Sequence, residues 1–211
     1  LHNSESDYDY RGIHIHNLKD VLSPFKTIKN TSWIEGDVDN TSYELADFCK
    51  QATHGNATIL EVFFSNKIIY STPIADEMRD NWEKFIDTDR VVMASRGYAS
   101  NQLNKMQLFD DVGVKDQKRT SKFAIAYCRV LWQCSEFLRT NEFKCQITDS
   151  DLKKFLLKLK SGWNDDYIPE CTERFAVLQS EVTNNWKNAK ILKPDIKWIE
   201  EFIYEAYSNN R

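Results

Sequence analysis

The stretch DYDYRGIHI, residues 7–15, places two aspartates immediately before an apolar, β-branched run. Alternation and β-branching predict a strand over 10–15, and side chains two residues apart on a strand project to the same side. Asp7 and Asp9 therefore share one side of the strand if it begins early enough. Their mutual repulsion raises the cost of ionising both carboxyls unless a cation lies between them. The pair predicts a divalent-metal site at the N-terminal end of a strand.

Composition indicates an ordinary globular protein of one domain, or of two small domains packed together. The 211 residues are 41% hydrophobic, which is enough to bury a sizeable core. The 28 basic and 32 acidic side chains give a net charge of −4. This balance is too mild to indicate nucleic-acid binding by itself, so any such interface must come from a local patch.

Cysteine usage and hydropathy predict a cytoplasmic protein. The five cysteines are an odd number and never form a CxxC pair, which is typical of a reducing compartment. No apolar run approaches the roughly 18 residues that cross a bilayer. The N-terminal segment lacks the basic flank and apolar core of a signal peptide. We therefore expect no membrane association.

The N-terminal part mixes short strand and helix signals. Residues 17–35 contain an apolar turn, a proline and two strand fragments. The segment 41–55 predicts a helix in which Thr41 is the N-cap and Glu44, three residues later, completes a capping box. Gly55 is its expected end. On this interpretation Glu44 has a structural role.

A compact apolar run, NATILEVFF at residues 56–64, predicts a buried strand with one carboxylate, Glu61. A carboxylate among apolar neighbours in a buried strand is costly unless it is partnered. We expect Glu61 to join Asp7 and Asp9, where a third carboxylate would let two ions lie roughly 3.5–4 Å apart. Oxygen-only ligation suits Mg²⁺, with Mn²⁺ as an alternative. Taken alone, the acidic run also fits a solvated loop.

After a further short strand predicted over residues 67–71, nearly every segment has a helical period. We predict a small α/β core over residues 1–87 and a helical domain over 88–211, which makes the fold α+β. The predicted helices cover residues 89–108 and 119–138, and three more helices centre on residues 152–159, 169–182 and 195–207.

The sequence resembles a known family in four stretches, which occur in order over residues 1–143: SESDYDYRGIHI, HGNATILEVFF, SRGYASNQLNKM and KFAIAYCRVLWQCSEFLRTNEF. Together they resemble the nucleotidyltransferases of the DNA polymerase β superfamily. More narrowly, they resemble the group associated with RNA repair in bacteria and phages, whose members follow the acidic pair with Arg-Gly.

The resemblance implies a mixed sheet on which Asp7 and Asp9 bind Mg²⁺ and nucleotide phosphates. Glu61 would complete the metal site and activate the attacking hydroxyl. The substrates would be an NTP, with ATP expected, and an acceptor hydroxyl on RNA, DNA or a protein. Such proteins also carry a Gly-Ser turn just before the acidic pair, and the 211 residues begin at Leu1, after the expected position of that turn.

Four basic residues are candidates for nucleotide binding. Arg11 follows the acidic pair and is expected to contact a phosphate or Asp9. Lys122 and Arg129 lie seven residues apart on one predicted helix face, where the resemblance suggests contacts with the β- and γ-phosphates. Arg96 lies in a stretch that the family also uses. The alternative for the two helical cations is a solvated basic face.

Two further patterns have mainly structural explanations. His14 and His16 share a strand face, but two ligands without cysteine partners make a poor zinc site. A lysine-rich helix could contact the phosphates of RNA or DNA, and it could equally be solvated surface. Its lysines are Lys153, Lys154, Lys158 and Lys160.

The sequence therefore predicts a Mg²⁺-dependent nucleotidyltransferase that moves a nucleoside monophosphate from an NTP to a hydroxyl. The alternative is a non-catalytic module that keeps the fold and binds a nucleotide, RNA or a partner protein. The sequence indicates neither the preferred base nor the oligomeric state.

Overall fold

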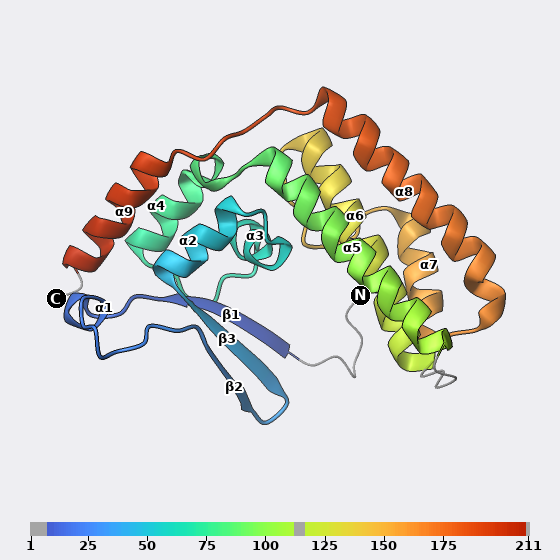
Figure 1. Ribbon diagram of the computed structural model, residues 1–211, viewed down its shortest axis with the longest axis horizontal. Helices are drawn as coiled ribbons and strands as arrows, with labels where there is room; N and C mark the ends of the chain where they lie inside the picture. Colours follow the sequence, from blue (N-terminus) through green and yellow to red (C-terminus); the bar gives the residue numbers. More distant parts are fainter. Residues whose placement is uncertain (1–7, 112–116, 210–211) are drawn as a thin grey trace. The chain divides into compact units, whose positions relative to one another are not determined.

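The computed structural model describes residues 8–111 and 117–209, and within them the side chains of residues 9–106 and 118–209. The fold is α+β, as the sequence predicted. A small three-stranded mixed sheet lies near the N-terminus, and the rest of the described chain is mostly helical (Figure 1). None of the described helices is long and apolar enough to cross a membrane.

The sheet has the strand order β1-β3-β2. Strand β1 (Tyr8–His14) pairs in parallel with β3 (Val38–Glu44), and β2 (Thr31–Glu35) pairs with β3 in antiparallel orientation. Gly36, at φ 63°, opens the two-residue turn between β2 and β3, because the first position of this turn needs a positive φ. Strand β1 confirms the strand predicted over residues 10–15 and begins two residues earlier.

The chain folds into two compact units. The sheet unit comprises the described residues up to Asp87 together with those from Leu192 onward, and the helical unit comprises Thr88–Ile191. The final helix, α9, therefore belongs with the sheet although it follows the helical unit in sequence.

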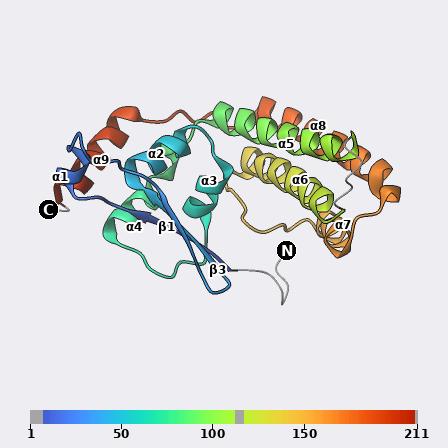
Figure 2. The ribbon, with the colours of Figure 1, turned by 60° about the horizontal axis from the view of Figure 1, so that its bottom comes forward.

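In the sheet unit, short helices form an aromatic core beside the ends of β1 and β3. Rings of Phe48, Phe63 and Phe85 contact one another in series, and Phe85 also contacts Phe202 of the last helix. The elements are α1 (Leu18–Val21), α2 (Leu45–Thr53), α3 (Ala57–Phe64), α4 (Pro73–Asp80), the 3₁₀ turn η1 (Trp82–Phe85) and α9 (Ile196–Asn209). The β2–β3 turn extends away from these helices in both views (Figures 1 and 2).

The helical unit packs around one central helix, α6, whose inward side chains, such as Leu131 and Phe137, are almost fully buried. Its elements are α5 (Thr88–Asp111), α6 (Gln117–Thr140), α7 (Ser150–Ser161), the 3₁₀ turn η2 (Asp165–Tyr167) and α8 (Ile168–Asn188). The helices predicted around residues 89–108, 119–138, 152–159, 169–182 and 195–207 are all confirmed; each is longer than predicted, and α8 is longer by seven residues.

The predicted strand over residues 56–64 is wrong, because α3 occupies this run. Ile59, Leu60 and Phe63 bury one face at helical spacing. The Asn56 side chain accepts from the Thr58 amide at 3.0 Å and caps the helix. An eight-residue apolar run fits either a strand or a buried helix turn, and this cap favours the helix.

Two smaller expectations are also wrong. Thr41 is not an N-cap, because it lies within β3, and α2 begins four residues later at Leu45. Residues 67–71 form no strand. They connect α3 to α4, with Ile69 78% and Tyr70 82% exposed.

Candidate functional site

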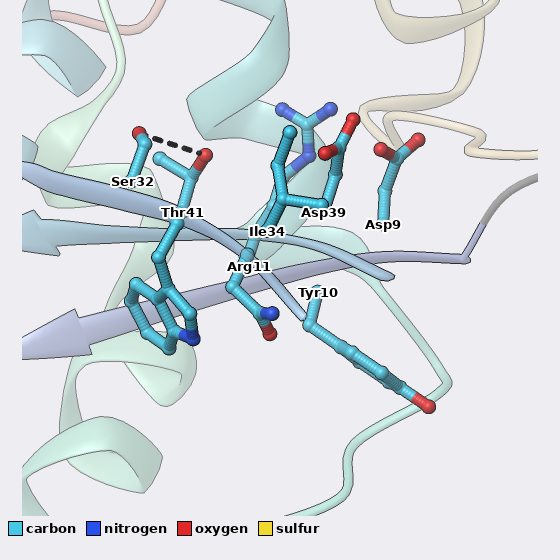
Figure 3. Close-up of a pocket in the computed structure, with 9 residues that line it drawn as sticks. Asp9, Tyr10, Arg11, Ser32, Ile34, Asp39 and Thr41 are labelled. Atoms are coloured by element: carbon cyan, nitrogen blue, oxygen red, sulfur yellow. Dashed lines mark hydrogen bonds between the residues drawn. The ribbon is translucent and has the colours of Figure 1, made fainter. Parts of the chain in front are cut away.

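The parallel pairing of β1 and β3 brings two carboxylates together at one end of the sheet. Asp9 is the register partner of Asp39, and Arg11 is the partner of Thr41. Because side chains alternate along a strand, all four project from the same face. On β2, Ile34 is the partner of Asp39. Figure 3 shows Asp9, Asp39, Ile34 and Arg11 on this face and Tyr10 on the opposite one.

A pocket of about 450 Å³ lies at this end of the sheet. That volume is within the range of ordinary small-molecule sites. The pocket combines acidic, basic, hydroxyl and apolar groups from all three strands, and its lining consists of Asp9, Tyr10, Arg11, Ser32, Trp33, Ile34, Asp39, Asn40 and Thr41 (Figure 3).

Both carboxylates of this pair are exposed, and neither has a hydrogen-bond or ion-pair partner among the described residues. Like charges on directly paired strand positions destabilise a sheet. A bound cation between them would remove the repulsion. Arg11 extends on the same face, so the site also offers a fixed positive charge next to the two acids (Figure 3).

The opposite end of β3 holds its other carboxylate in a different environment. Glu44 is 3% exposed and caps α2, because its Oε2 accepts from the amides of Ala46 at 2.9 Å and Asp47 at 3.2 Å. The Tyr207 hydroxyl of α9 donates to Oε1 of Glu44. Burial, and then this hydrogen bond, raise the pKa of Tyr207, which keeps the phenol protonated. The structural role expected for Glu44 is confirmed, as the cap itself.

His14, the last residue of β1, and His16, just after the strand, lie beside this buried end. His14 Nδ1 is 2.8 Å from Ser42 Oγ, and the Nε2 atoms of His14 and His16 are 3.2 Å apart. Burial, and then the neighbouring His16, lower the pKa of His14, while Glu44 raises it by a smaller amount. No group of three His, Cys, Asp or Glu side chains suited to a metal occurs among the described residues, so the pair finds no third protein ligand there.

Comparison with known protein families gives a match that covers residues 1–195. The matched family is described as RlaP, the RNA repair pathway DNA polymerase beta family. This match covers more than half of the chain. The chain belongs to the RNA repair pathway DNA polymerase beta family. Comparisons with curated proteins and with solved structures found no match.

Membership in the RNA repair pathway DNA polymerase beta family confirms the resemblance seen in the acidic pair and the later stretches. It makes the chain a member of a nucleotidyltransferase family linked to RNA repair. The exposed carboxylates of β1 and β3 are the feature of the described structure that suits this family's use of a divalent metal.

Three predicted metal ligands have different outcomes in this family member. Asp9 lies at the pocket, and Asp7 lies outside the described residues. Glu61 lies on helix α3, not on a strand, and does not form a three-carboxylate group with Asp9 and Asp39. The metal-binding role of Glu61 stays a prediction, which the sheet pairing does not favour.

The four predicted nucleotide-binding residues are divided between the units. Arg11 lines the pocket. Arg96, on α5, donates to Thr183 Oγ1 at 2.6 Å and lies over the Trp186 ring. Both of these contacts lie within the helical unit. Lys122 and Arg129 are exposed on α6. Nucleotide binding by these four residues stays a prediction.

The residue that sequence reasoning missed is Asp39. It lies in EGDVDNTSYE, residues 35–44, where a Gly-Asp turn precedes alternating side chains. That turn is a hairpin signal, so a strand over 38–44 could have been predicted. The parallel pairing with β1, which places Asp39 beside Asp9, connects residues 30 apart and has no local signature.

Proposed function

We propose that this protein transfers a nucleoside monophosphate from an NTP to a hydroxyl at the end of a nucleic acid. The acceptor oxygen would attack the α-phosphorus, and the bond from that phosphorus to the pyrophosphate oxygen would break. One observation supports this most: Asp9 and Asp39 are exposed register partners on one face of the sheet, where both line a pocket of about 450 Å³.

The residues at this pocket fit a hard divalent cation, Mg²⁺ or Mn²⁺. Their acidic donors are carboxylate oxygens without protein partners among the described residues, which is the ligand chemistry that Mg²⁺ prefers. Asp9 and Asp39, together with Asp7, would hold the ion. When bound, it would neutralise phosphate charge and lower the pKa of the acceptor hydroxyl.

The remaining pocket residues would position the nucleotide. Arg11 presents a guanidinium beside the acids, and this group makes paired hydrogen bonds to phosphate oxygens. Ile34 is 75% exposed next to Asp39, so it offers an apolar surface for the sugar or the base. A ligand that covers the Ile34 side chain would bury apolar surface, and the hydrophobic effect would then favour binding.

The test uses the full-length protein with each labelled NTP, Mg²⁺, and RNA, DNA or protein acceptors. Asp9→Asn is expected to reduce transfer by at least about 100-fold, as loss of a group that stabilises transition-state charge does. Asp37→Asn is the matched control, because Asp37 is an exposed acid in the β2–β3 turn. Wild-type protein without transfer to any acceptor, or equal activity in Asp9→Asn, would contradict the proposal.

A second candidate function is nucleotide binding without catalysis. It would use the same pocket, because the exposed carboxylates and Arg11 suit a metal-bound nucleotide whether or not transfer follows. Calorimetry with ATP and Mg²⁺ distinguishes the two functions. Metal-dependent ATP binding in a protein that transfers nothing to any acceptor would support this second function.

A further inference from the structure

The two units carry opposite net charges. The helical unit, Thr88–Ile191, has 17 basic and 13 acidic side chains, whereas the rest of the chain has 11 basic and 19 acidic ones. The units thus have formal charges of +4 and −8 within a chain of net charge −4. Such asymmetry between parts of one protein indicates that the positive part contacts a polyanion.

Part of this positive charge follows one exposed stripe of helix α6. Lys118, Lys122 and Arg129 are exposed and lie on one helix face, at spacings of 4 and 7 residues. They extend over roughly 16 Å of the helix axis. The stripe ends at Glu136, whose carboxylate is bound by Arg139 at 2.9 Å and Lys144 at 2.6 Å.

The beginning of α6 concentrates positive charge further. Its first turn contains no acidic residue, and Lys118 and Arg119 are both exposed there. A helix N-terminus already carries a partial positive charge, so cations in this position are locally unfavourable. A bound anion would convert this unfavourable arrangement into a favourable one.

Helix α7 adds two lysines beside the stripe. The Ser121 hydroxyl of α6 donates to the Leu159 carbonyl, which fixes the end of α7 against the beginning of α6. Figures 1 and 2 both show these two helix ends side by side in the helical unit. On α7, Lys153 and Lys160 are exposed and lie seven residues apart, on one flank.

A third lysine of α7 faces a different neighbour. Lys158 pairs with Glu170 of α8 at 2.7 Å and lies over the Tyr167 ring. It therefore marks the flank of α7 that faces α8. Lys153 and Lys160 lie on the other flank, so they add to the charge of the α6 stripe.

We infer that Lys118 and Lys122 of α6, with Lys153 and Lys160 of α7, form a surface that binds the sugar-phosphate backbone of single-stranded RNA. In the proposed function this RNA is the acceptor of the nucleotide. That role rests on the proposed function, whereas RNA binding by the four lysines does not. We call these four lysines the basic surface.

The length of the basic surface favours a polynucleotide over one nucleotide. Adjacent phosphates of an NTP share a bridging oxygen, whereas the basic surface spreads its cations over two helices, with Lys118 and Lys122 about one turn apart on α6 and Lys153 and Lys160 about two turns apart on α7. Successive phosphates of a nucleic-acid strand can each meet one of these cations. The contacts are to the backbone, so the surface is expected to tolerate many RNA sequences.

The test measures fluorescence anisotropy of a 5′-labelled, unstructured 20-nucleotide RNA with the full chain over a salt series. Two double variants, Lys118→Gln/Lys122→Gln and Lys153→Gln/Lys160→Gln, are each expected to weaken binding about tenfold or more near 0.1 M salt. Each lost phosphate contact reduces the slope of log K against log salt by about 0.7 for a single strand. Each double variant is therefore expected to be shallower by about 1.4.

The matched control is Lys67→Gln/Lys197→Gln, which removes two exposed lysines of the sheet unit. It is expected to bind RNA like the wild type. Asp39→Asn is also expected to retain RNA binding, so failure of catalysis is distinguishable from failure of this inference. Thermal melting of every variant verifies that it is folded.

Three outcomes would overturn the inference. The basic-surface variants could bind the RNA as tightly as the wild type, or weaken no more than the control. The variants could raise only the KM for the NTP, and Lys122 would then be assigned to nucleotide binding instead of RNA binding. They could lose binding to an acidic polypeptide, such as polyglutamate, while RNA binding remains intact, which would identify a protein partner.

Discussion

Strand β3 carries a carboxylate near each end, and the protein treats the two in opposite ways. Glu44 is 3% exposed and accepts hydrogen bonds from two amides and the Tyr207 hydroxyl. Asp39 is exposed and makes no hydrogen bond or ion pair with any described residue. It lies opposite Asp9 in the register of β1 and β3. The first arrangement stabilises the fold, and the second leaves charge available for a ligand. The following predictions test this contrast.

The largest effect on stability is expected at Glu44. Glu44→Ala leaves two amides and a phenol hydroxyl unpaired in a buried place and removes a helix cap, so it is expected to lower the free energy of unfolding by about 2–4 kcal/mol. Asp39→Ala is the matched control and is expected to change it by no more than about 0.5 kcal/mol. Urea denaturation measures both. Equal losses would remove the contrast between the two carboxylates.

Tyr207→Phe isolates the contact that joins α9 to the end of β3. Loss of a hydroxyl that donates to a buried carboxylate is expected to cost about 1–3 kcal/mol. Tyr204→Phe provides the control, since the Tyr204 side chain is 69% exposed on the same helix. The same urea denaturation compares them. If both variants unfold like the wild type, the α9 contact does not stabilise the sheet unit.

Some parts of the fold and of the candidate site could be predicted from the sequence, and others could not. The helical period of 119–138 was sufficient to predict α6, since its buried face is continuous in sequence. The run 56–64 was not sufficient, because a short, mostly apolar run fits either a strand or a helix, and the Asn56 cap favours the helix. Asp9 could be assigned to the site from local spacing. Asp39 could not, because its place beside Asp9 depends on a parallel pairing across 30 residues.

Mg²⁺ is expected to stabilise the wild type through the exposed pair. At a Mg²⁺ concentration ten times the dissociation constant, binding contributes about 1.4 kcal/mol, or a rise in Tm of roughly 3–6 °C for a chain of this size. Thermal melting with and without Mg²⁺ measures this shift. Asp39→Asn is expected to lose the shift while melting no lower than the wild type without metal, because it removes a like-charge contact. A full shift in Asp39→Asn would exclude Asp39 as a ligand.

The smallest effect is expected from pH at the buried end. The pKa of His14 is lowered from its ordinary value of 6.5, so below about pH 6.5 the unfolded chain binds a proton that the native chain resists. The free energy of unfolding should therefore decrease as pH falls through this window and should be unaffected by His14 at higher pH. His14→Gln is expected to flatten the dependence, as measured by urea denaturation at pH 7.5 and 5.5. His54→Gln, at an exposed position, should leave it as steep as in the wild type.

The most direct test of the account compares the two candidates for the third carboxylate, Asp39 on the sheet and Glu61 on helix α3. The measurement is the rate at which Asp39→Asn and Glu61→Gln transfer labelled nucleotide to RNA, in protein shown to be folded. Asp39→Asn is expected to be slower than the wild type by at least about 100-fold, and Glu61→Gln to remain within about threefold of it. A loss confined to Glu61→Gln, with Asp39→Asn as active as the wild type, would contradict the site proposed on β1 and β3.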